Sequence, residues 1–417
     1  MTSLDTAATL ELETGTIAGG GGCVAHAPDG RVVFVRHSLP GERVVARVTA
    51  TTSSFLRADA VEILSASPDR VPPPCGHAGP GRCGGCDFQH ASPAAQRRLK
   101  ASRVAEQLER IAGVAPGVEV EAVAGAEDGL GWRTRIRLGA DADGRVGFRR
   151  HRSHDLEYVE SCPIAHPDVM ATGALGARWP GVKEIEVVVA PGRTDAFVAV
   201  DAVPRTKPTL PQLGTGLVLN GRVRQVPAAV NVTVAGVTFR VSAGVFWQVH
   251  VGAADALAAA ARSALAAVPG DVAVDLYAGA GLFSVLLATD VGEGGSVLAV
   301  ERDRRACADA RHNGRRHPQL AVRQASITPR LVEQGIGDPT LVVLDPAREG
   351  AGTPVMAALS RLSSVRRLVY VSCDAGSFSR DIRVLLEAGW TMSSLRAFDI
   401  FPMTEHVELV AGFDAPT

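Results

Sequence analysis

The sequence has no long apolar segment and no excess of charge of either sign. No apolar run reaches about 18 residues, the length at which a membrane-spanning helix is expected. Residues 1–19 contain neither a basic n-region nor an apolar core, so we expect no signal peptide. The formal net charge is −1, which excludes a uniform field attracting nucleic acid and leaves only a local basic patch for any polyanion. These absences predict a cytoplasmic protein that does not enter a membrane.

The chain is nevertheless rich in core-forming residues and long enough for more than one core. It has 417 residues, of which 46% are hydrophobic, so we expect two or three domains. We find no internal repeat in it. Its seven cysteines are, in a cytoplasmic protein, more often metal ligands or catalytic thiols than disulfides.

Three successive patterns divide the chain into predicted domains. Residues 10–66 alternate in polarity between glycine turns, including the glycine run at 19–22, which predicts a small antiparallel, OB-like β-barrel. Residues 67–230 begin with prolines and cysteines and then continue with a helix from the N-cap Ser92 to about Gly113. Short strands and turns follow that helix, so we expect a central α+β domain there.

Residues 231–417 alternate strands with helices, which is typical of an α/β domain with a parallel sheet covered on both faces. Two closely spaced last strands would add an antiparallel edge to this sheet. The expected helices are 254–267, 282–288, 303–313, 353–362 and 377–388, and the expected strands are 272–276, 296–301, 341–345, 367–372, 394–400 and 406–412.

A glycine turn at 275–281 follows the first strand of this domain and opens a helix. Gly279 and Gly281 let the backbone turn sharply and approach a ligand closely. Glu301 ends the next strand, twenty positions after Gly281, where a carboxylate can accept both ribose hydroxyls of a nucleotide. The third glycine of the dinucleotide fingerprint is missing, which favours S-adenosylmethionine over NAD. The alternative is an ordinary tight turn of any α/β domain.

Three further side chains lie at or near the ends of predicted strands, where ligands of open α/β sheets gather. Cys373 follows the strand 368–372 and is a candidate nucleophile, although a free cysteine is more often a buried structural residue. Asp345 ends the strand 341–344. Glu408 is flanked by apolar residues, which should raise its pKa and suit it to act as a base, unless it faces solvent. A thiol, a base and a cofactor loop together predict covalent catalysis with a bound group donor.

A second set of cysteines has the character of a metal site. Cys75, Cys83 and Cys86 lie in a glycine-rich segment, and Cys162 precedes a Pro-Ile pair. Four thiolates can hold zinc or an iron–sulfur cluster, and the spacing does not choose between them. Cys23 and Cys307 have no such partners and are interpreted as small packed residues.

The motifs occur in a family-specific order: Phe-Trp-Gln-Val at 246–249, the glycine turn at 275–281, Asp-Pro-Ala-Arg at 345–348, Val-Ser-Cys-Asp at 371–374 and His-Val-Glu at 406–408. With them, the chain resembles over nearly its whole length the bacterial RNA uracil-5-methyltransferases, which include 23S rRNA and tRNA uridine methylases. The resemblance implies a TRAM domain for the barrel, a Rossmann-like class I methyltransferase domain at 231–417 and a central iron–sulfur domain. The family often has asparagine where this chain has Asp374.

The resemblance also assigns roles to residues. It implies that Cys373 is the nucleophile, that Glu408 is the base, and that four further residues contact S-adenosyl-L-methionine: Gln248, Tyr277, Glu301 and Asp345. It implies a 4Fe–4S cluster on Cys75, Cys83, Cys86 and Cys162. The implied substrate is structured RNA, with ribosomal RNA favoured over tRNA because the barrel accompanies the rRNA enzymes, and we expect a monomer. The alternatives are a tRNA methylase, a non-catalytic iron–sulfur RNA-binding protein and a small-molecule methyltransferase.

Alternating arginines mark a possible surface for RNA. Arg133, Arg135 and Arg137 should point to one face of a strand, and the arginines at 149, 150 and 152 add charge nearby. This pattern predicts a local phosphate-binding patch, and the alternative is an ordinary solvated face.

Overall fold

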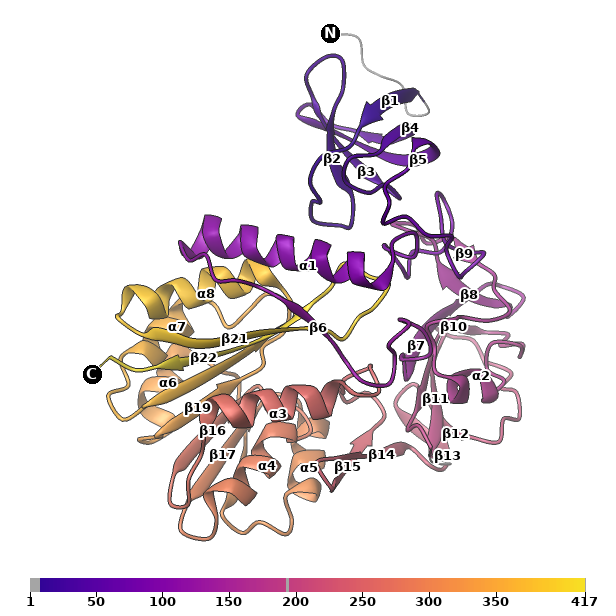
Figure 1. The fold of residues 1–417 in the computed structure, drawn as a ribbon. Helices are drawn as coiled ribbons and strands as arrows, with labels where there is room; N and C mark the ends of the chain where they lie inside the picture. Colours follow the sequence, from indigo (N-terminus) through magenta and orange to yellow (C-terminus); the bar gives the residue numbers. More distant parts are fainter. Residues whose placement is uncertain (1–7, 193–194, 417) are drawn as a thin grey trace.

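The computed structural model describes residues 8–192 and 195–416. Figure 1 shows an N-terminal barrel at the top, a central sheet on the right and a C-terminal α/β domain on the left. Among the described residues, no helix is long and apolar enough to cross a membrane.

The barrel consists of β1 (Thr9–Glu13), β2 (Cys23–His26), β3 (Val32–Arg36), β4 (Arg43–Thr51) and β5 (Phe55–Ser65), paired in the order β1-β4-β5-β3-β2. Alternate residues of these strands point inward and form a separate apolar core, which includes Val33, Val44 and Leu56. The predicted barrel is therefore confirmed, with one correction. β3 and β5 pair in parallel rather than antiparallel. The chain reverses in β4 and reverses again into β5, which pairs antiparallel with β4, so β5 runs in the same direction as β3.

The central sheet has the order β13-β12-β11-β10-β7-β8-β9. Its strands are β7 (Arg135–Ala140), β8 (Val146–Arg149), β9 (Leu156–Glu157), β10 (Val182–Val189), β11 (Ala196–Ala202), β12 (Gly216–Leu219) and β13 (Arg222–Gln225). The short helix α2 (Pro167–Ala171) packs against β10. Trp179 is completely buried here, and its indole N–H donates to the carbonyl of Ala174 at 2.9 Å, which satisfies its polar atom within the core.

The C-terminal sheet has the order β18-β17-β16-β19-β20-β22-β21-β6. The parallel strands are β16 (Val272–Leu276), β17 (Ser296–Glu301), β18 (Leu320–Gln324), β19 (Leu341–Leu344) and β20 (Arg367–Ser372). The strand β22 (Glu408–Asp414) runs antiparallel between β20 and β21 (Thr391–Asp399). The parallel sheet with an antiparallel edge is as predicted.

Helices cover both faces of this sheet. On one face, α3 (Ala253–Leu265), α4 (Leu282–Val291) and α5 (Arg304–Asn313) share an apolar core with residues such as Ala273 and Val343. On the other, α6 (Pro329–Gly335), α7 (Thr353–Ser360) and α8 (Ala375–Glu387) pack on Val274 and Leu344. Neither the strand β18 nor the helix α6 was predicted. β18 is a five-residue edge strand, and three of its residues are exposed.

Two elements of the predicted central domain (residues 67–230) pack on the C-terminal α/β domain. The helix α1 (Pro93–Gln107) lies against α8, and β6 (Val120–Ala122) pairs in parallel with β21 at the edge of the sheet (Figure 1). Ser92 caps α1 as predicted, since its hydroxyl accepts the N–H of Ala95. A π-helical turn, η1 (Leu108–Ala112), then ends at Gly113. The domain limits at residues 66 and 230 stay a prediction, but segment 93–122 is attached to the α/β domain.

Candidate active site

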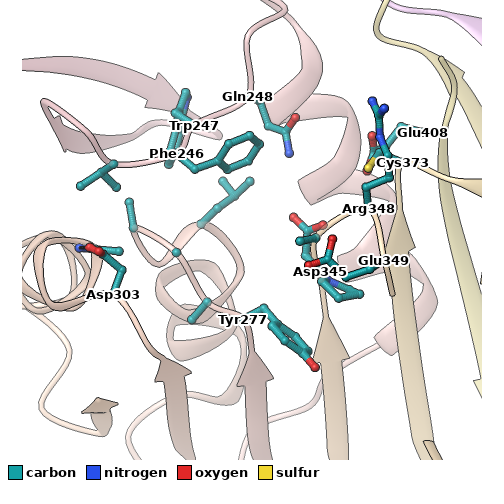
Figure 2. A pocket seen from close by; sticks show the side chains of 18 of the residues that line it. Phe246, Trp247, Gln248, Tyr277, Asp303, Asp345, Arg348, Glu349, Cys373 and Glu408 are labelled. Carbon is teal, nitrogen blue, oxygen red and sulfur yellow. Dashed lines mark hydrogen bonds between the residues drawn. The ribbon is translucent and has the colours of Figure 1, made fainter. Parts of the chain in front are cut away.

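A cavity of about 970 Å³ opens at the carboxyl ends of the parallel strands. It brings together all six residues predicted to bind the cofactor or to act in catalysis, which are Gln248, Tyr277, Glu301, Asp345, Cys373 and Glu408. Figure 2 shows Cys373, Arg348 and Glu408 grouped on one side, with Asp345 between them and Tyr277. The segment 246–248 approaches from outside the sheet and supplies Gln248.

The turn after β16 is built for close backbone approach. Tyr277, Gly279 and Gly281 all have positive φ angles, of 64°, 54° and 90°. A Cβ at Gly281 would lie 3.3 Å from the Cα of Ala310, so this glycine lets the turn pack on α5. A Cβ at Gly279 would meet nothing within 4 Å, which leaves its neighbourhood open toward the cavity.

Glu301 is held at the mouth of this turn by backbone donors. One carboxylate oxygen accepts the N–H of Gly279 at 3.0 Å, and the other accepts the N–H of Asp303 at 2.7 Å. Each oxygen keeps a further lone pair, so the carboxylate can still accept hydroxyl groups of a ligand. Burial raises the pKa of the Tyr277 phenol to about 12, with the Asp381 carboxylate adding to the shift, so the tyrosine is neutral at physiological pH.

Two acids on the neighbouring strands β16 and β19 have raised pKa values, Asp275 within β16 and Asp345 directly after β19. Asp275 is completely buried, accepts the hydroxyl of Ser284, and has a pKa raised by burial to about 7. It was part of the predicted turn, but its role as an anchor for α4 is visible only in the structure. Burial, with the charge of Asp275 adding to it, also raises the pKa of Asp345 to about 7. Asp345 directly follows β19 and lines the cavity.

Gln248 follows β15 (Val237–Ser242), which forms a hairpin with β14 (Ala229–Val234). Trp247 is buried against Phe239, with ring centroids 5.4 Å apart, while Phe246 is 64% exposed at the cavity. The Arg135 guanidinium donates to the carbonyl of Val245 at 2.9 Å and so helps to fix this segment.

The three arginines predicted to bind RNA do not form one open cationic face, and their role in RNA binding stays a prediction. The Arg135 guanidinium donates to the carbonyl of Val245. The side chain of Arg133 donates to the carbonyl of Arg135 at 3.0 Å, and Arg133 lines the catalytic cavity. Arg137 is exposed but forms ion pairs with Glu184 and Glu186. Arg135 and Arg137 lie on one side of β7, whereas Arg133 precedes the strand, and of the three it is Arg135 that is bonded to the segment before Gln248.

Cys373 and Glu408 face each other because their strands are neighbours. Ser372 of β20 pairs with Leu409 of β22, so the residues just beyond this pair, Cys373 and Glu408, meet at the cavity. Burial raises the pKa of the Cys373 thiol to about 11; Glu408 adds to the shift, and the charge and hydrogen bond of Arg348 oppose it. Burial and the nearby Asp345 raise the pKa of Glu408 well above its usual value. A carboxylate in this environment is a strong proton acceptor.

Sequence reasoning gave no role to Arg348, His406 or the N-cap of α8. Arg348 lies next to the thiol and within 3.3 Å of the ring nitrogen Nε2 of His406. Asp374 accepts the N–H of Ser377 at 2.7 Å and begins α8, which keeps Cys373 between a strand end and a helix start. The motif Asp-Pro-Ala-Arg contained Arg348, but only the packing shows that its charge faces Cys373.

The four cysteines predicted to bind a metal line a second cavity of about 260 Å³; they are Cys75, Cys83, Cys86 and Cys162. Burial raises the pKa of Cys83 to about 11 and that of Cys86 to about 12, and the neighbouring thiols add to both shifts. Gln89 bridges two of the four, since it accepts the N–H of Cys75 and donates to the sulfur of Cys86, each at 3.1 Å. Within residues 8–192 and 195–416, no His, Cys, Asp or Glu side chains converge as a group able to hold a single metal ion.

Comparisons with known proteins agree with this geometry. A model of the TRAM domain matches residues 15–61, inside the barrel. The chain is 44% identical, over 96% of its length and 97% of the relative's, to an uncharacterized RNA methyltransferase of Streptomyces avermitilis. It is 32% identical, over 97% of its length and 93% of the relative's, to the Pseudomonas putida protein named 23S rRNA (uracil(1939)-C(5))-methyltransferase RlmD.

The fold is also similar to a solved structure. The crystal structure of the Pyrococcus abyssi tRNA (uracil-54, C5)-methyltransferase in complex with S-adenosyl-L-homocysteine matches with a TM-score of 0.73 and 22% identity. The match covers 97% of this chain and 99% of the other, so the barrel, central sheet and α/β domain recur together. By its sequence relatives, its TRAM domain and its fold, the chain belongs to the family of S-adenosylmethionine-dependent RNA uracil-5-methyltransferases.

Proposed function

We propose that this protein methylates carbon 5 of a uridine in RNA through a transient covalent adduct on Cys373. The observation that carries the proposal is the meeting of Cys373 and Glu408 in one cavity with the glycine turn and the Glu301 carboxylate. S-adenosylmethionine would supply the methyl group. Glu301, Asp345, Gln248 and the backbone of Gly279 would hold this co-substrate, because the cavity places them around the open side of the turn.

The proposed chemistry needs a thiolate first and a base last. Carbon 5 of uracil is a poor nucleophile, and addition of the Cys373 thiolate at carbon 6 converts the ring into an enolate. Carbon 5 then takes the methyl group from the sulfonium. Glu408 removes the proton from carbon 5, and the ring expels the thiolate as the double bond re-forms. Arg348 would favour the thiolate, since its charge lowers the pKa of a thiol that burial has raised.

An intact reaction centre argues against a purely RNA-binding protein. The nucleophile, the base and the cofactor-loop residues line the same cavity, and nothing in a binding module would require this arrangement. A small-molecule methyltransferase would have no use for the barrel.

RNA is proposed to dock where the barrel meets the central sheet. Burial lowers the pKa of Arg57, with the charge of Arg152 adding to it, so two arginines of different domains lie near each other there. The backbone of His151, the residue before Arg152, packs against Gly84, since a Cβ added at Gly84 would lie 2.8 Å from the Cα of His151. Gly84 also lines the catalytic cavity. Phosphates bound at this junction would pass close to the cavity mouth, and binding should weaken as salt rises.

We expect ribosomal RNA to be the substrate rather than tRNA. The proposal is supported by the TRAM domain and by the similarity to the Pseudomonas putida enzyme named for 23S rRNA. The test is methyl transfer from labelled S-adenosylmethionine to unmodified ribosomal RNA and to unmodified tRNA, with digestion to nucleosides to identify 5-methyluridine. Label in tRNA alone would overturn the preference for ribosomal RNA, and the absence of 5-methyluridine from both would contradict the reaction itself. The cytoplasmic location and the monomeric state stay predictions.

The second cavity is proposed to hold a 4Fe–4S cluster. A cubane binds each of its four thiolates to a different iron, so its ligands surround a volume, whereas the four ligands of a zinc ion converge on one point. The four cysteines here surround a cavity, and their donor set fits the cluster. With four thiolate ligands, the cluster would have no open coordination position, which suits a structural role.

Protein purified without oxygen should therefore be brown and contain about four irons per chain. Cys83→Ser should lose iron and absorbance, because it removes one of the four thiols that line the second cavity. Cys23→Ser is the matched control, since Cys23 is a buried thiol of the barrel that donates to the carbonyl of Ser38. One zinc per chain without iron would exclude the cluster.

A further inference from the structure

We propose that the barrel and the cysteine segment (residues 75–88) position the catalytic base by holding the β21–β22 loop (residues 400–407), an inference that rests on the function proposed above for Glu408. This loop joins β21 to β22, and Glu408 is the first residue of β22. Thr404 and His406 of the loop line the catalytic cavity. The position of the loop therefore sets the position of Glu408.

The glycine run at 19–22 supplies the first contact. Gly20 and Gly21 have φ angles of 87° and 69°, and their successive N–H groups both donate to one carboxylate oxygen of Glu405, at 2.5 and 3.0 Å. Successive amides in this conformation form a concave site for an anion. The site is filled by a side chain from the other end of the chain, which lies three positions before Glu408.

The cysteine segment supplies the second contact. The N–H groups of Asp87 and Phe88 both donate to the carbonyl of Met403, at 2.8 and 2.9 Å. The side chain of Asp87 accepts the N–H of Glu405 at 3.2 Å and forms an ion pair with Arg36 of the barrel at 3.4 Å. Asp87 directly follows the predicted cluster ligand Cys86, so the metal site and the loop are joined by adjacent residues.

The helix α1 supplies the third contact, from within the core. Lys100 is completely buried, and its ammonium group donates to Asp399 at 2.5 Å and to the carbonyl of Phe401 at 3.0 Å. Gln96 accepts the N–H of Met403 at 2.8 Å. Met403 itself has a φ of 66°, which a residue with a side chain adopts only where its surroundings hold it.

These contacts do more than attach two domains. A barrel that served only to bind RNA could be connected to the α/β domain by a flexible linker. Here, instead, its glycine amides bind the loop that leads into the base Glu408. The barrel and the cysteine segment are thus positioning elements for proton removal from carbon 5. Glu405, Asp87 and Gly21 are positioning residues, and none of them is assigned contact with the reacting atoms.

The test compares substitutions that weaken the contacts of the barrel and the cysteine segment with the β21–β22 loop with matched control substitutions. A Cβ at Gly21 would lie 2.7 Å from the Cβ of Asp87, whereas a Cβ at Gly30, in another barrel turn with a φ of 85°, would meet nothing within 4 Å. Gly21→Ala and Gly30→Ala therefore carry similar backbone strain, but only the first displaces the cysteine segment. Glu405→Ala removes the carboxylate from the amides, and Glu405→Gln retains one acceptor oxygen and should restore part of the function.

We expect Glu405→Ala and Gly21→Ala to slow adduct resolution roughly ten- to a hundredfold, the cost of a small misplacement of a catalytic group. The covalent RNA adduct should accumulate in a single turnover, while methyl transfer and the affinities for S-adenosylmethionine and RNA stay close to those of the wild type. Gly30→Ala should resolve the adduct normally, and Glu405→Gln should be intermediate.

A change in RNA affinity without a change in adduct resolution would overturn the proposal, because the barrel would then serve RNA docking alone. Normal resolution in Glu405→Ala would overturn it as well, and this variant decides the matter if Gly21→Ala does not fold. Failure of the proposed function looks different, since the wild-type protein itself would then form no adduct and no 5-methyluridine.

Discussion

Cys373→Ala should abolish both methyl transfer and covalent capture of RNA. The thiolate forms the bond that activates carbon 5, and no other cysteine lines the catalytic cavity within the described part of the chain. The rate of methyl transfer should fall by at least about a thousandfold, because loss of a covalent nucleophile removes the whole pathway. The measurement is incubation with RNA containing 5-fluorouridine and S-adenosylmethionine, followed by denaturing electrophoresis. Fluorine at carbon 5 blocks elimination and traps the adduct.

Cys307→Ala is the matched control for this experiment. Cys307 is another buried thiol of the α/β domain, and its sulfur donates only to the carbonyl of Glu301, which also accepts the N–H of Ala325. Its removal should leave capture intact. An adduct that persists in Cys373→Ala would show that another residue is the nucleophile. Thiolate formation also gives a pH dependence: because burial raises the pKa of Cys373, adduct formation should accelerate as the pH rises above neutrality.

Glu408→Gln should methylate RNA once and then release it slowly. The base acts after methyl transfer, so its loss should leave the first chemical step and reduce steady-state turnover by roughly a hundred- to ten-thousandfold, the usual contribution of general base catalysis. A rapid-quench experiment should show a burst of methylated RNA that remains attached to protein. Turnover at the wild-type rate would remove Glu408 from the mechanism.

The pH profile separates loss of the base from a general defect. Burial raises the pKa of Glu408, so its basic form appears only above the usual range of a carboxyl group. Adduct resolution by the wild-type enzyme should rise with pH as Glu408 loses its proton, and Glu408→Gln should lack this rise. Glu387→Gln, at the exposed end of α8, should retain it.

The two variants also distinguish the positioning role of the barrel from catalysis itself. Glu408→Gln removes the base, whereas Glu405→Ala leaves it in place but frees the loop that precedes it. Both should accumulate adduct, and only the Glu405 variant should keep the pH dependence of resolution. A barrel that grips the loop also explains why TRAM domain, cysteine segment and α/β domain form a continuous structure rather than separate modules.

The sequence by itself determined the reaction centre, because each part of it lies in a short local pattern. Apolar strands that end in Asp345 or Cys373, and a strand that runs into a glycine turn, can be recognised within a few residues. Parallel strands of one sheet end at the same edge, so residues at those ends must converge. Local patterns thus predicted the α/β class, the barrel and four cavity residues, namely Glu301, Asp345, Cys373 and Glu408. Gln248 and Tyr277 were assigned only by the family resemblance.

Only the tertiary structure decided which polar side chains remain available and which distant segments meet. Arg135 lies on the side of β7 that the alternation predicted, but its guanidinium donates to the carbonyl of Val245. No pattern within the strand could reveal this contact. The exposed edge strand β18 and the short β6 have little periodicity of their own, and β6 pairs with β21 far along the chain. The glycine run binds Glu405 across 385 positions. Such contacts depend on complementary shape and charge between elements already folded, and periodicity along the chain carries no information about them.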